Sequence, residues 1–338
     1  MAVELHREGG RPQRPDLVQG DTSMWKWREF FPPLPNPVSL GEGNTPLVPL
    51  RYMAGVWIKD ERANPTGSFK DRMASLAVSW AQAQGFRTVA VASTGNAAVS
   101  TAAYAAAAGL RCVILAKNGG MASSDMECSL RGMGAEIRFT ETWHARWTEL
   151  ERGVREQDWY PISNYRIPPV SSQPVGVRAY RSLAYEIAEQ RSWSPPDWIV
   201  VPVSRGDALC AMVAGFDEIR RLGWISRVPR MLAVVRFPSL QEAVRSGREQ
   251  PLPSEYPDRV AALSISDPQA TAAAVRAVRR SGGDVLVLDD DDLARAQAEA
   301  ASHGWLVELS SAAAMAGAAE LLQQGSGGDI VALVTAAG

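Results

Sequence analysis

A lysine at the start of a predicted helix is the residue whose setting most favours covalent chemistry. Lys70 stands in the run Asn64-Pro-Thr-Gly-Ser-Phe-Lys-Asp-Arg72. The first four residues of that run are turn-forming types, and Ser68 is a type that caps helices. At a helix start, unpaired backbone N–H groups and the positive end of the helix dipole disfavour an ammonium group. We therefore expect Lys70 to lose its proton readily and to form a Schiff base with an aldehyde.

Two further turns have the composition of anion-binding sites. The turn Ser93-Thr-Gly-Asn96 and the turn Val203-Ser-Arg-Gly-Asp-Ala208 each stand between a short apolar run and a helix-forming run. Free N–H groups at a helix start attract anions, so each turn predicts a place for a carboxylate or a phosphate. In the second turn Arg205 suits a phosphate, whereas Asp207 repels one unless it points away. The ordinary alternatives are two plain capped turns and, for Lys70, a solvated surface lysine.

Alternating strands and helices must position these turns. Apolar residues spaced i, i+3, i+4 and i+7 predict the helix that begins at the lysine turn. Repeated strand–helix units predict a parallel sheet with right-handed crossovers. We predict strands at 56–59, 88–92, 112–116, 136–139, 198–202, 231–235, 285–288 and 330–334. We predict helices around 25–31, at 68–84, 97–108, 123–133, 142–157, 177–190, 209–221, near 241, at 271–280, 293–303 and after 308, with 160–175 irregular.

The chain is long enough for two lobes. Its 338 residues exceed the usual size of one domain, and 46% hydrophobic with 21% charged residues is ordinary globular composition. We assign residues 1–22 to a flexible N-terminal tail, 23–84 and 161–338 to a large domain, and 85–160 to a small domain. The polar tail and the shortness of the apolar runs predict a cytoplasmic protein that does not enter a membrane.

Charge and residue counts argue against several classes of partner and site. A net charge of −2 provides no basic surface for nucleic acid or for a membrane. Three cysteines, Cys112, Cys128 and Cys210, are far apart in the sequence, which argues against a disulfide framework or a cysteine metal site. The three histidines are equally scattered, so a histidine metal centre or a Ser-His-Asp triad lacks its residues. The sequence therefore predicts chemistry without a metal.

Four motifs in a fixed order resemble the fold-type II pyridoxal-phosphate (PLP) enzymes, and most closely the threonine synthases among them. They are Glu42-Gly-Asn-Thr-Pro-Leu47, the Asn64–Arg72 run, Ser93-Thr-Gly-Asn-Ala-Ala98 and Glu308-Leu-Ser-Ser-Ala-Ala313, and the resemblance runs from about Trp25 to the C-terminus. It implies an α/β fold of two lobes, like the β subunit of tryptophan synthase, with parallel and mixed sheets and helices on both faces. It also implies PLP as the cofactor, an amino-acid substrate and a homodimer.

The resemblance implies roles for individual residues. Lys70 forms the Schiff base with PLP and later moves protons. Asn96 binds the 3′-oxygen of PLP, and Thr335 places a hydroxyl against the pyridine nitrogen, which leaves that nitrogen unprotonated and favours elimination and replacement. Arg166, in Ser163-Asn-Tyr-Arg-Ile167, is the candidate to grip a substrate phosphate. The substrate carboxylate is bound by Ser93, Thr94 and Gly95. The cofactor phosphate is bound by the loop Ser204, Arg205, Gly206, Asp207 and Ala208.

Three functions stay open at this point. The first is a PLP-dependent carbon–oxygen lyase acting on an L-amino acid with a β- or γ-leaving group, with threonine formation from O-phosphohomoserine as its specific version. The second is β-replacement or dehydration on serine, threonine or an activated serine, as in cysteine synthase or threonine dehydratase, which needs no phosphate grip. The third is a catalytically silent binding subunit, suggested by the Ser-Arg-Gly-Asp-Ala loop and the short ending Ala336-Ala-Gly338. The intact Lys70 and Thr335 argue against the third.

Overall fold

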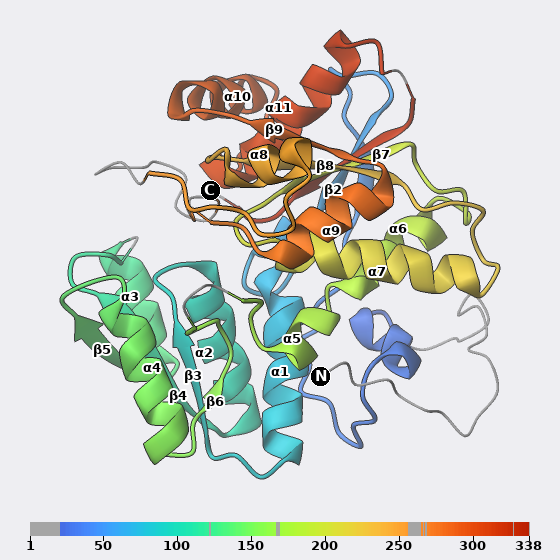
Figure 1. Cartoon of the computed structure of the whole chain (residues 1–338). Coiled ribbons are helices and arrows are strands. Elements are labelled where there is room, and N and C mark those ends of the chain that lie inside the picture. Colours follow the sequence, from blue (N-terminus) through green and yellow to red (C-terminus); the bar gives the residue numbers. More distant parts are fainter. Residues whose placement is uncertain are drawn as a thin grey trace.

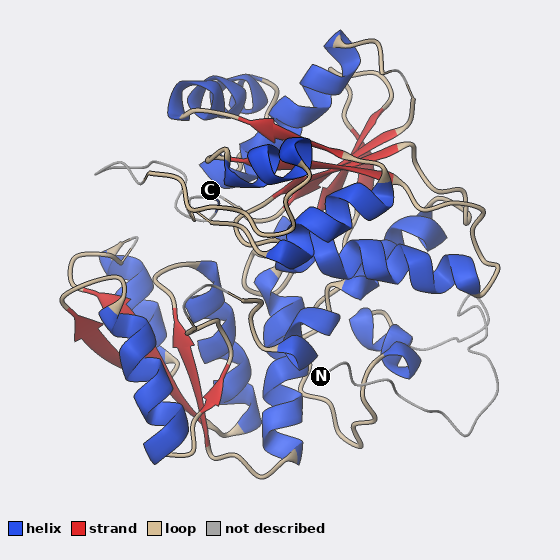
Figure 2. Cartoon of the chain, viewed as in Figure 1, coloured by secondary structure: helices blue, strands red, loops and turns tan. Residues whose placement is uncertain are grey.

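Two β-sheets, each enclosed by helices, make up the fold (Figure 1, Figure 2). The computed structural model describes residues 21–121, 123–166, 170–255, 265, 267, 269–326 and 328–337. Most of the predicted tail at 1–22, Ile167 of the Arg166 segment and the terminal Gly338 lie outside these residues. One parallel and one mixed sheet with helices on their faces confirm the predicted fold class.

The larger sheet is mixed and has six strands. They are β1 Leu47–Pro49, β2 Val56–Asp60, β7 Trp198–Pro202, β8 Arg230–Val235, β9 Asp284–Val287 and β10 Ile330–Val334. The order is β1-β2-β10-β7-β8-β9, in which β1 and β2 are antiparallel and the other neighbours are parallel. Because β10 pairs with both β2 and β7, the last strand of the chain lies inside the sheet. The residues that follow β10 therefore emerge beside the end of β2.

The smaller sheet is parallel and has the order β5-β4-β3-β6. Its strands are β3 Thr88–Ala92, β4 Arg111–Lys117, β5 Glu136–Thr140 and β6 Tyr160–Pro161. The prediction that residues 160–175 are irregular is wrong at both ends, because Tyr160–Pro161 pairs with β3 and a helix begins at Pro174. A proline is tolerated in β6 because this strand lies at the edge of the sheet. The predicted domain boundaries at 84/85 and 160/161 stay predictions.

Helices pack on both faces of each sheet (Figure 1). The α-helices are α1 Lys70–Ala83, α2 Asn96–Ala108, α3 Ser124–Gly132, α4 Ala145–Glu156, α5 Pro174–Arg178, α6 Arg181–Gln190, α7 Asp207–Arg221, α8 Ser239–Ser246, α9 Ala272–Ser281, α10 Asp290–Ser302 and α11 Leu309–Gln323. Two 3₁₀-helices, η2 Met24–Phe30 and η3 Glu61–Ala63, complete the elements in these ranges. The single helix predicted at 177–190 is wrong, since α5 and α6 are separated at Ala179 and Tyr180.

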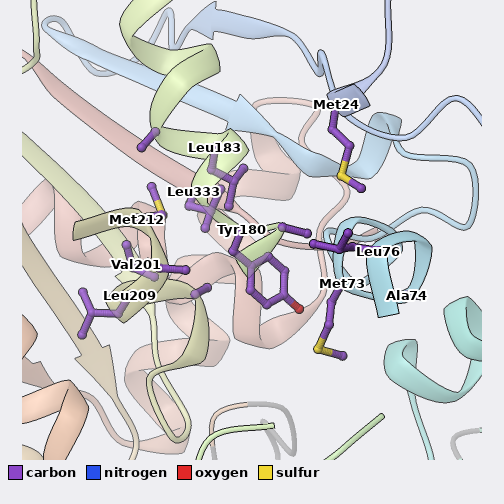
Figure 3. Close-up of a cluster of buried hydrophobic side chains, with 14 of the residues drawn as sticks. Met24, Met73, Ala74, Leu76, Tyr180, Leu183, Val201, Leu209, Met212 and Leu333 are labelled. Atoms are coloured by element: carbon purple, nitrogen blue, oxygen red, sulfur yellow. The ribbon is translucent and has the colours of Figure 1, made fainter. Parts of the chain in front are cut away.

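The core follows from strands that bury both of their faces. In β7, Ile199 and Val201 pack in one hydrophobic cluster and Val200 in another, on the opposite face of the sheet. The sequences of such strands are continuous apolar runs, which is why the positions of these strands are predictable. Figure 3 shows the first cluster, in which Val201 lies with Met73 of α1 and other buried side chains. The helix α1 thereby ties the larger sheet to the helices of the smaller one, where it packs along α2.

The described part of the chain contains no disulfide, no cluster of metal ligands and no helix suited to cross a membrane. All three cysteines are free, with Cys112 buried and Cys128 exposed. Within the described ranges, no group of three His, Cys, Asp or Glu side chains lies close enough to hold a metal ion. Over the same residues, no helix combines the length and the apolar character that crossing a membrane requires.

Candidate active site

Lys70 is the first residue of α1, at the point where the preceding turn meets the helix. The hydroxyl of Ser68 accepts a hydrogen bond from the backbone N–H of Lys70 at 3.3 Å, although the N-cap position itself falls on Phe69. The next residue, Asp71, is fully buried, and its carboxylate accepts from both the backbone N–H and the hydroxyl of Thr66. The turn and the first helical residues are thus bound to each other, which fixes where the lysine side chain starts.

Aromatic rings, rather than a carboxylate, lie against the Lys70 amine. The nitrogen is 4.4 Å from the ring centre of Phe69 and 5.7 Å from that of Tyr180, and the two rings are stacked. In the part of the chain that the structure describes, no carboxylate oxygen comes within 4.0 Å of this amine. The chain has only four lysines, of which Lys26 and Lys59 are ion-paired and Lys117 lies 5.7 Å from the ring centre of Trp143 in the smaller-sheet region. Lys70 is the lysine that starts a helix at the predicted site.

The pKa of the Lys70 amine is lowered, which favours the predicted formation of a Schiff base. Burial is the largest cause, the carboxylates of Asp207 and Glu308 oppose it, and the charge of Arg205 adds to it. The sequence predicts this effect from the helix start, whereas in the folded chain removal from water is the main cause. At a given pH more of the Lys70 amine is neutral than of a surface lysine, and the neutral form is the nucleophile.

The end of β10 closes one side of the lysine turn. The N–H of Phe69 donates to the carbonyl of Thr335 at 2.9 Å, and the N–H of Ala337 donates to the carbonyl of Gly67 at 3.1 Å. The Thr335 side chain is buried, with its hydroxyl oxygen 2.9 Å from that of Ser311 at the start of α11. Two parts of the chain far apart in sequence therefore bring the predicted ring-nitrogen contact beside the predicted Schiff-base lysine.

The carboxylate of Glu308, to which no predicted role belongs, joins two of the predicted cofactor contacts. Glu308 accepts a hydrogen bond from Nδ2 of Asn96 at 3.1 Å and from the hydroxyl of Thr335 at 3.4 Å. Asn96 is the first residue of α2, which follows β3, so this contact connects the two sheets. The available signal was an acidic residue directly before a helix of small residues, but a sequence pattern does not say which way that side chain turns.

The predicted carboxylate turn at 93–95 lies next to the segment that contains Arg166. The N–H of Ala92 donates to the hydroxyl of Ser163 at 2.9 Å, which anchors that segment to the end of β3. Arg166 itself is exposed, and its guanidinium lies 5.9 Å from the ring centre of Tyr165. The fold thus brings the segment to the turn, while the guanidinium of Arg166 stays at the surface.

The predicted phosphate loop at 204–208 leads into the first turn of α7. Gly206 has φ 104°, and a Cβ at this position would lie 2.5 Å from the Cβ of Ala274, so the loop requires glycine here. In the described part of the chain, the first backbone N–H groups of α7 donate to no acceptor. The carboxylate of Asp207 accepts from the backbone N–H of Ser172 at 3.2 Å, which directs it toward the segment that follows Arg166.

Arg205 bridges the two sheets. Its guanidinium forms an ion pair with Asp267, at 2.7 Å between Nε and Oδ2, and lies 4.7 Å from the ring centre of Trp147 in α4. The side chain therefore links the loop after β7 to a helix of the smaller sheet. Since Asp267 already compensates its charge, a contact between Arg205 and a cofactor phosphate stays a prediction.

A buried ion network holds α1 in place two residues beyond Lys70. Arg72 pairs with Glu61 at 2.7 Å and with Glu186 of α6 at 2.6 Å, and Lys59 of β2 pairs with Glu186 at 2.7 Å. All four side chains have no exposed area. Burial by itself raises the pKa of Glu186, but the charges of Arg72 and Lys59 lower it well below its usual value. The four residues thus form a neutral set of charges that joins three elements around the lysine helix.

The comparisons with known proteins identify the family. A family model described as pyridoxal-phosphate dependent enzyme matches residues 38–336. The chain belongs to this family. The PLP enzyme is 33% identical over 313 residues to the threonine synthase of Methanosarcina acetivorans, an alignment that covers 90% of this chain and 76% of that protein. It is 31% identical over 336 residues to the threonine synthase of Halalkalibacterium halodurans, with 94% and 90% covered.

A solved structure supports the same fold. The L-serine ammonia-lyase of the fungus Rhizomucor miehei matches this PLP enzyme with a TM-score of 0.73 at 20% identity, covering 87% of this chain and 93% of that one. At this level of identity the match concerns the fold alone. It agrees with the fold-type II architecture that the motifs predict.

The residues at the site fit PLP by their chemistry. A partly buried lysine amine with a lowered pKa suits an aldehyde, and the unpaired N–H groups at the start of α7 suit a phosphate. The hydroxyl of Tyr180, whose ring lies by the Lys70 amine, is buried and has no hydrogen-bond partner among the described residues. A buried donor without an acceptor is costly, so a polar ligand that reaches it would be favoured.

Substituting Gly206 should damage the loop that precedes α7. We expect Gly206→Ala to lower the free energy of unfolding by about 1–3 kcal/mol more than Gly223→Ala, because only the first substitution adds a steric clash to an unfavourable positive φ. Gly223 follows the other end of α7, has φ 78° and has open space around it. Urea unfolding of both variants measures the difference, and equal losses would contradict the close packing on Ala274.

Proposed function

We propose that this PLP enzyme is a lyase that acts on an L-amino acid with a β- or γ-leaving group, and that its substrate is O-phosphohomoserine, converted to threonine and phosphate. The observation that carries the proposal is the Lys70 amine with its lowered pKa, on which the charges of Asp207, the first residue of α7, and of Glu308, bonded to the first residue of α2, both act. The similarity to threonine synthases over about nine-tenths of the chain supports the choice of substrate.

The predicted site residues other than Arg166 have the following tasks under this proposal. The Lys70 amine holds the cofactor aldehyde and then takes and returns the proton of the substrate α-carbon. The turn Ser93, Thr94 and Gly95 binds the substrate carboxylate, and the loop Ser204–Ala208 binds the cofactor phosphate. PLP, when bound, draws electrons from the substrate α-carbon. Asn96 and Thr335 orient its ring, and a hydroxyl at position 335, rather than a carboxylate, leaves the ring nitrogen without a proton.

An absorption spectrum of the purified protein is the first test. Protein that becomes coloured on addition of PLP, and releases phosphate from O-phosphohomoserine, supports the proposal. Protein that stays colourless supports the silent binding subunit instead.

The exposure of Arg166 gives a reason to keep the second function as an alternative. Its guanidinium is turned toward solvent and Tyr165, so no contact with a substrate phosphate follows from the arrangement of this segment. Dehydration of serine or threonine, or β-replacement on an activated serine, needs no such contact. Release of a keto acid from serine or threonine, faster than release of phosphate from O-phosphohomoserine, would favour this alternative.

Removing the Arg166 guanidinium separates the two functions. If the first function holds and Arg166 binds the substrate phosphate, Arg166→Ala should lower kcat/KM for O-phosphohomoserine by about 10–100-fold, because a hydrogen bond between charged groups contributes about 1.5–3 kcal/mol. Any release of keto acid from serine should change less than about twofold, since serine carries no phosphate. Arg152→Ala, on the exposed side of α4 where Arg152 pairs with Glu149, is the matched control. An equal loss on both substrates would show that Arg166 does not bind the phosphate.

The cytoplasmic location and the homodimer stay predictions. Light scattering coupled to size-exclusion chromatography tests the second, with the mass of one chain, 36.5 kDa, as the result that contradicts it.

A further inference from the structure

Glu308 is the charged residue of the site to which no motif assigns a task. One oxygen of its carboxylate lies 3.1 Å from Nδ2 of Asn96, and the other lies 3.4 Å from the hydroxyl oxygen of Thr335. Its negative charge also acts on the Lys70 amine, whose pKa it raises against the lowering effect of burial. A single carboxylate thus contacts both residues that are proposed to hold the cofactor ring.

A role in starting α11 does not account for this side chain. Glu308 occupies the N-cap position of α11, but its carboxylate makes no capping hydrogen bond. The backbone does that work, because the carbonyl of Glu308 accepts from the N–H groups of Ser311 and Ala312 at 2.9 and 3.0 Å. Glutamate is also not among the residue types preferred at N-caps. The side chain is directed away from its own helix and toward Asn96 and Thr335.

The contact with Asn96 decides how that amide is oriented. A carboxylate only accepts hydrogen bonds, so it binds the NH₂ group of the amide and disfavours the flipped orientation, in which the amide oxygen would face it. The amide nitrogen carries two hydrogens, and Glu308 uses one. The second remains to donate to the 3′-oxygen of PLP, which is the contact proposed for Asn96.

The Thr335 hydroxyl can donate only one hydrogen bond at a time, which limits its contact with Glu308. The hydroxyl of Ser311 accepts from the N–H of Ala336 at 3.0 Å and lies 2.9 Å from the hydroxyl of Thr335. The Ser311 hydroxyl also donates to the carbonyl of Ala336 at 3.1 Å, so the single hydroxyl proton of Thr335 can go to Glu308, to Ser311 or to a ring nitrogen. Donation from Thr335 to a ring nitrogen therefore withdraws this proton from Glu308 and Ser311, whereas the bond from Asn96 to Glu308 can persist.

We propose that Glu308 is a positioning residue for PLP, whose carboxylate holds the Asn96 amide with its nitrogen toward the cofactor ring. This inference rests on the proposed function, from which it takes the contacts of Asn96 and Thr335. A competing role is that of a placeholder, in which the carboxylate occupies the space of the ring and is displaced on binding. The two roles predict opposite effects on the affinity for PLP.

The test is a titration of the cofactor-free protein with PLP, followed by visible absorbance. We expect Glu308→Ala to weaken PLP binding by about tenfold or more, since the charged acceptor that orients Asn96 is lost. Glu308→Gln keeps an acceptor oxygen at the same place and should lose less. Glu320→Gln, further along the same helix, where Glu320 accepts from Gln324, should bind PLP like the wild type. If Glu308→Ala does not fold, Glu308→Gln and Glu308→Asp provide the comparison, with the shorter Asp expected to bind more weakly than Gln.

A double variant shows whether Glu308 acts through Asn96. In an Asn96→Ala background, the further change Glu308→Ala should weaken PLP binding by less than about twofold, because its partner is already absent. Two full and additive losses would overturn the inference, as would binding by Glu308→Ala that equals or exceeds that of the wild type. A wild-type protein whose colour with PLP disappears on Lys70→Ala, and which releases phosphate from O-phosphohomoserine, supports the proposed function, so these failures would then count against Glu308 alone. A wild-type protein that binds no PLP would overturn both.

Discussion

Lys70→Ala is expected to abolish the visible absorbance that PLP gives to the protein and to lower turnover by at least about 10³-fold. The physical reason is that this amine is removed from water, has a lowered pKa and lies outside any ion pair in the described chain, so it reacts with an aldehyde more readily than the other lysines. Reduction with borohydride, followed by peptide mass spectrometry, locates the attached cofactor. The label should fall on Lys70.

Because the chain has few lysines, the labelling experiment has few alternative sites to exclude. Besides Lys70 the chain contains Lys26, Lys59 and Lys117. Lys26 pairs with Glu189 near the surface, so Lys26→Ala is a suitable control that removes an amine without touching the site. A Lys70→Ala protein that keeps its colour, or a label found on Lys117, would contradict the assignment. Thermal unfolding of the cofactor-free variant shows that loss of colour does not come from loss of folding.

Arg72→Met is expected to destabilise the protein by about 3–5 kcal/mol, because it removes one partner from a buried set of charges. Glu61 and Glu186 would keep their negative charges with Lys59 as the remaining cation of the set, and none of these side chains reaches solvent. The loss should also loosen the start of α1 and weaken PLP binding at Lys70, two residues away. Urea unfolding of the cofactor-free protein measures the first effect, and a PLP titration measures the second.

A surface ion pair serves as the control for Arg72. Arg111 pairs with Glu136 at the edge of the smaller sheet, where the two side chains are 69% and 45% exposed. Arg111→Met should therefore change stability by less than about 1 kcal/mol. If Arg72→Met proved equally harmless, the buried network would not be what holds α1, and the position of Lys70 would have to depend on the bonds between Asp71 and the preceding turn.

Local sequence patterns were sufficient for most of the regular elements of this fold. β3, β7 and β10 lie where the apolar runs predicted them, because strands covered on both faces require such runs. Patterns failed at Tyr160–Pro161, where two residues complete a strand only because β3 offers a free edge. They failed again at Tyr180, where one apparent helix is two, since the break lets this buried side chain pack beside Phe69.

Residue types at fixed short spacings were enough to predict the Schiff-base lysine and the turns before α2 and α7, and to recognise a PLP-dependent family. Which distant side chains meet depends instead on the folded chain. It brought Thr335 to the lysine turn by placing β10 beside β2, and it turned Glu308 toward Asn96 instead of toward its own helix. It also made burial the main cause of the lowered pKa of Lys70. The physical reason is that desolvation and side-chain direction depend on what packs around a residue, and neighbours far away in the chain supply most of that packing.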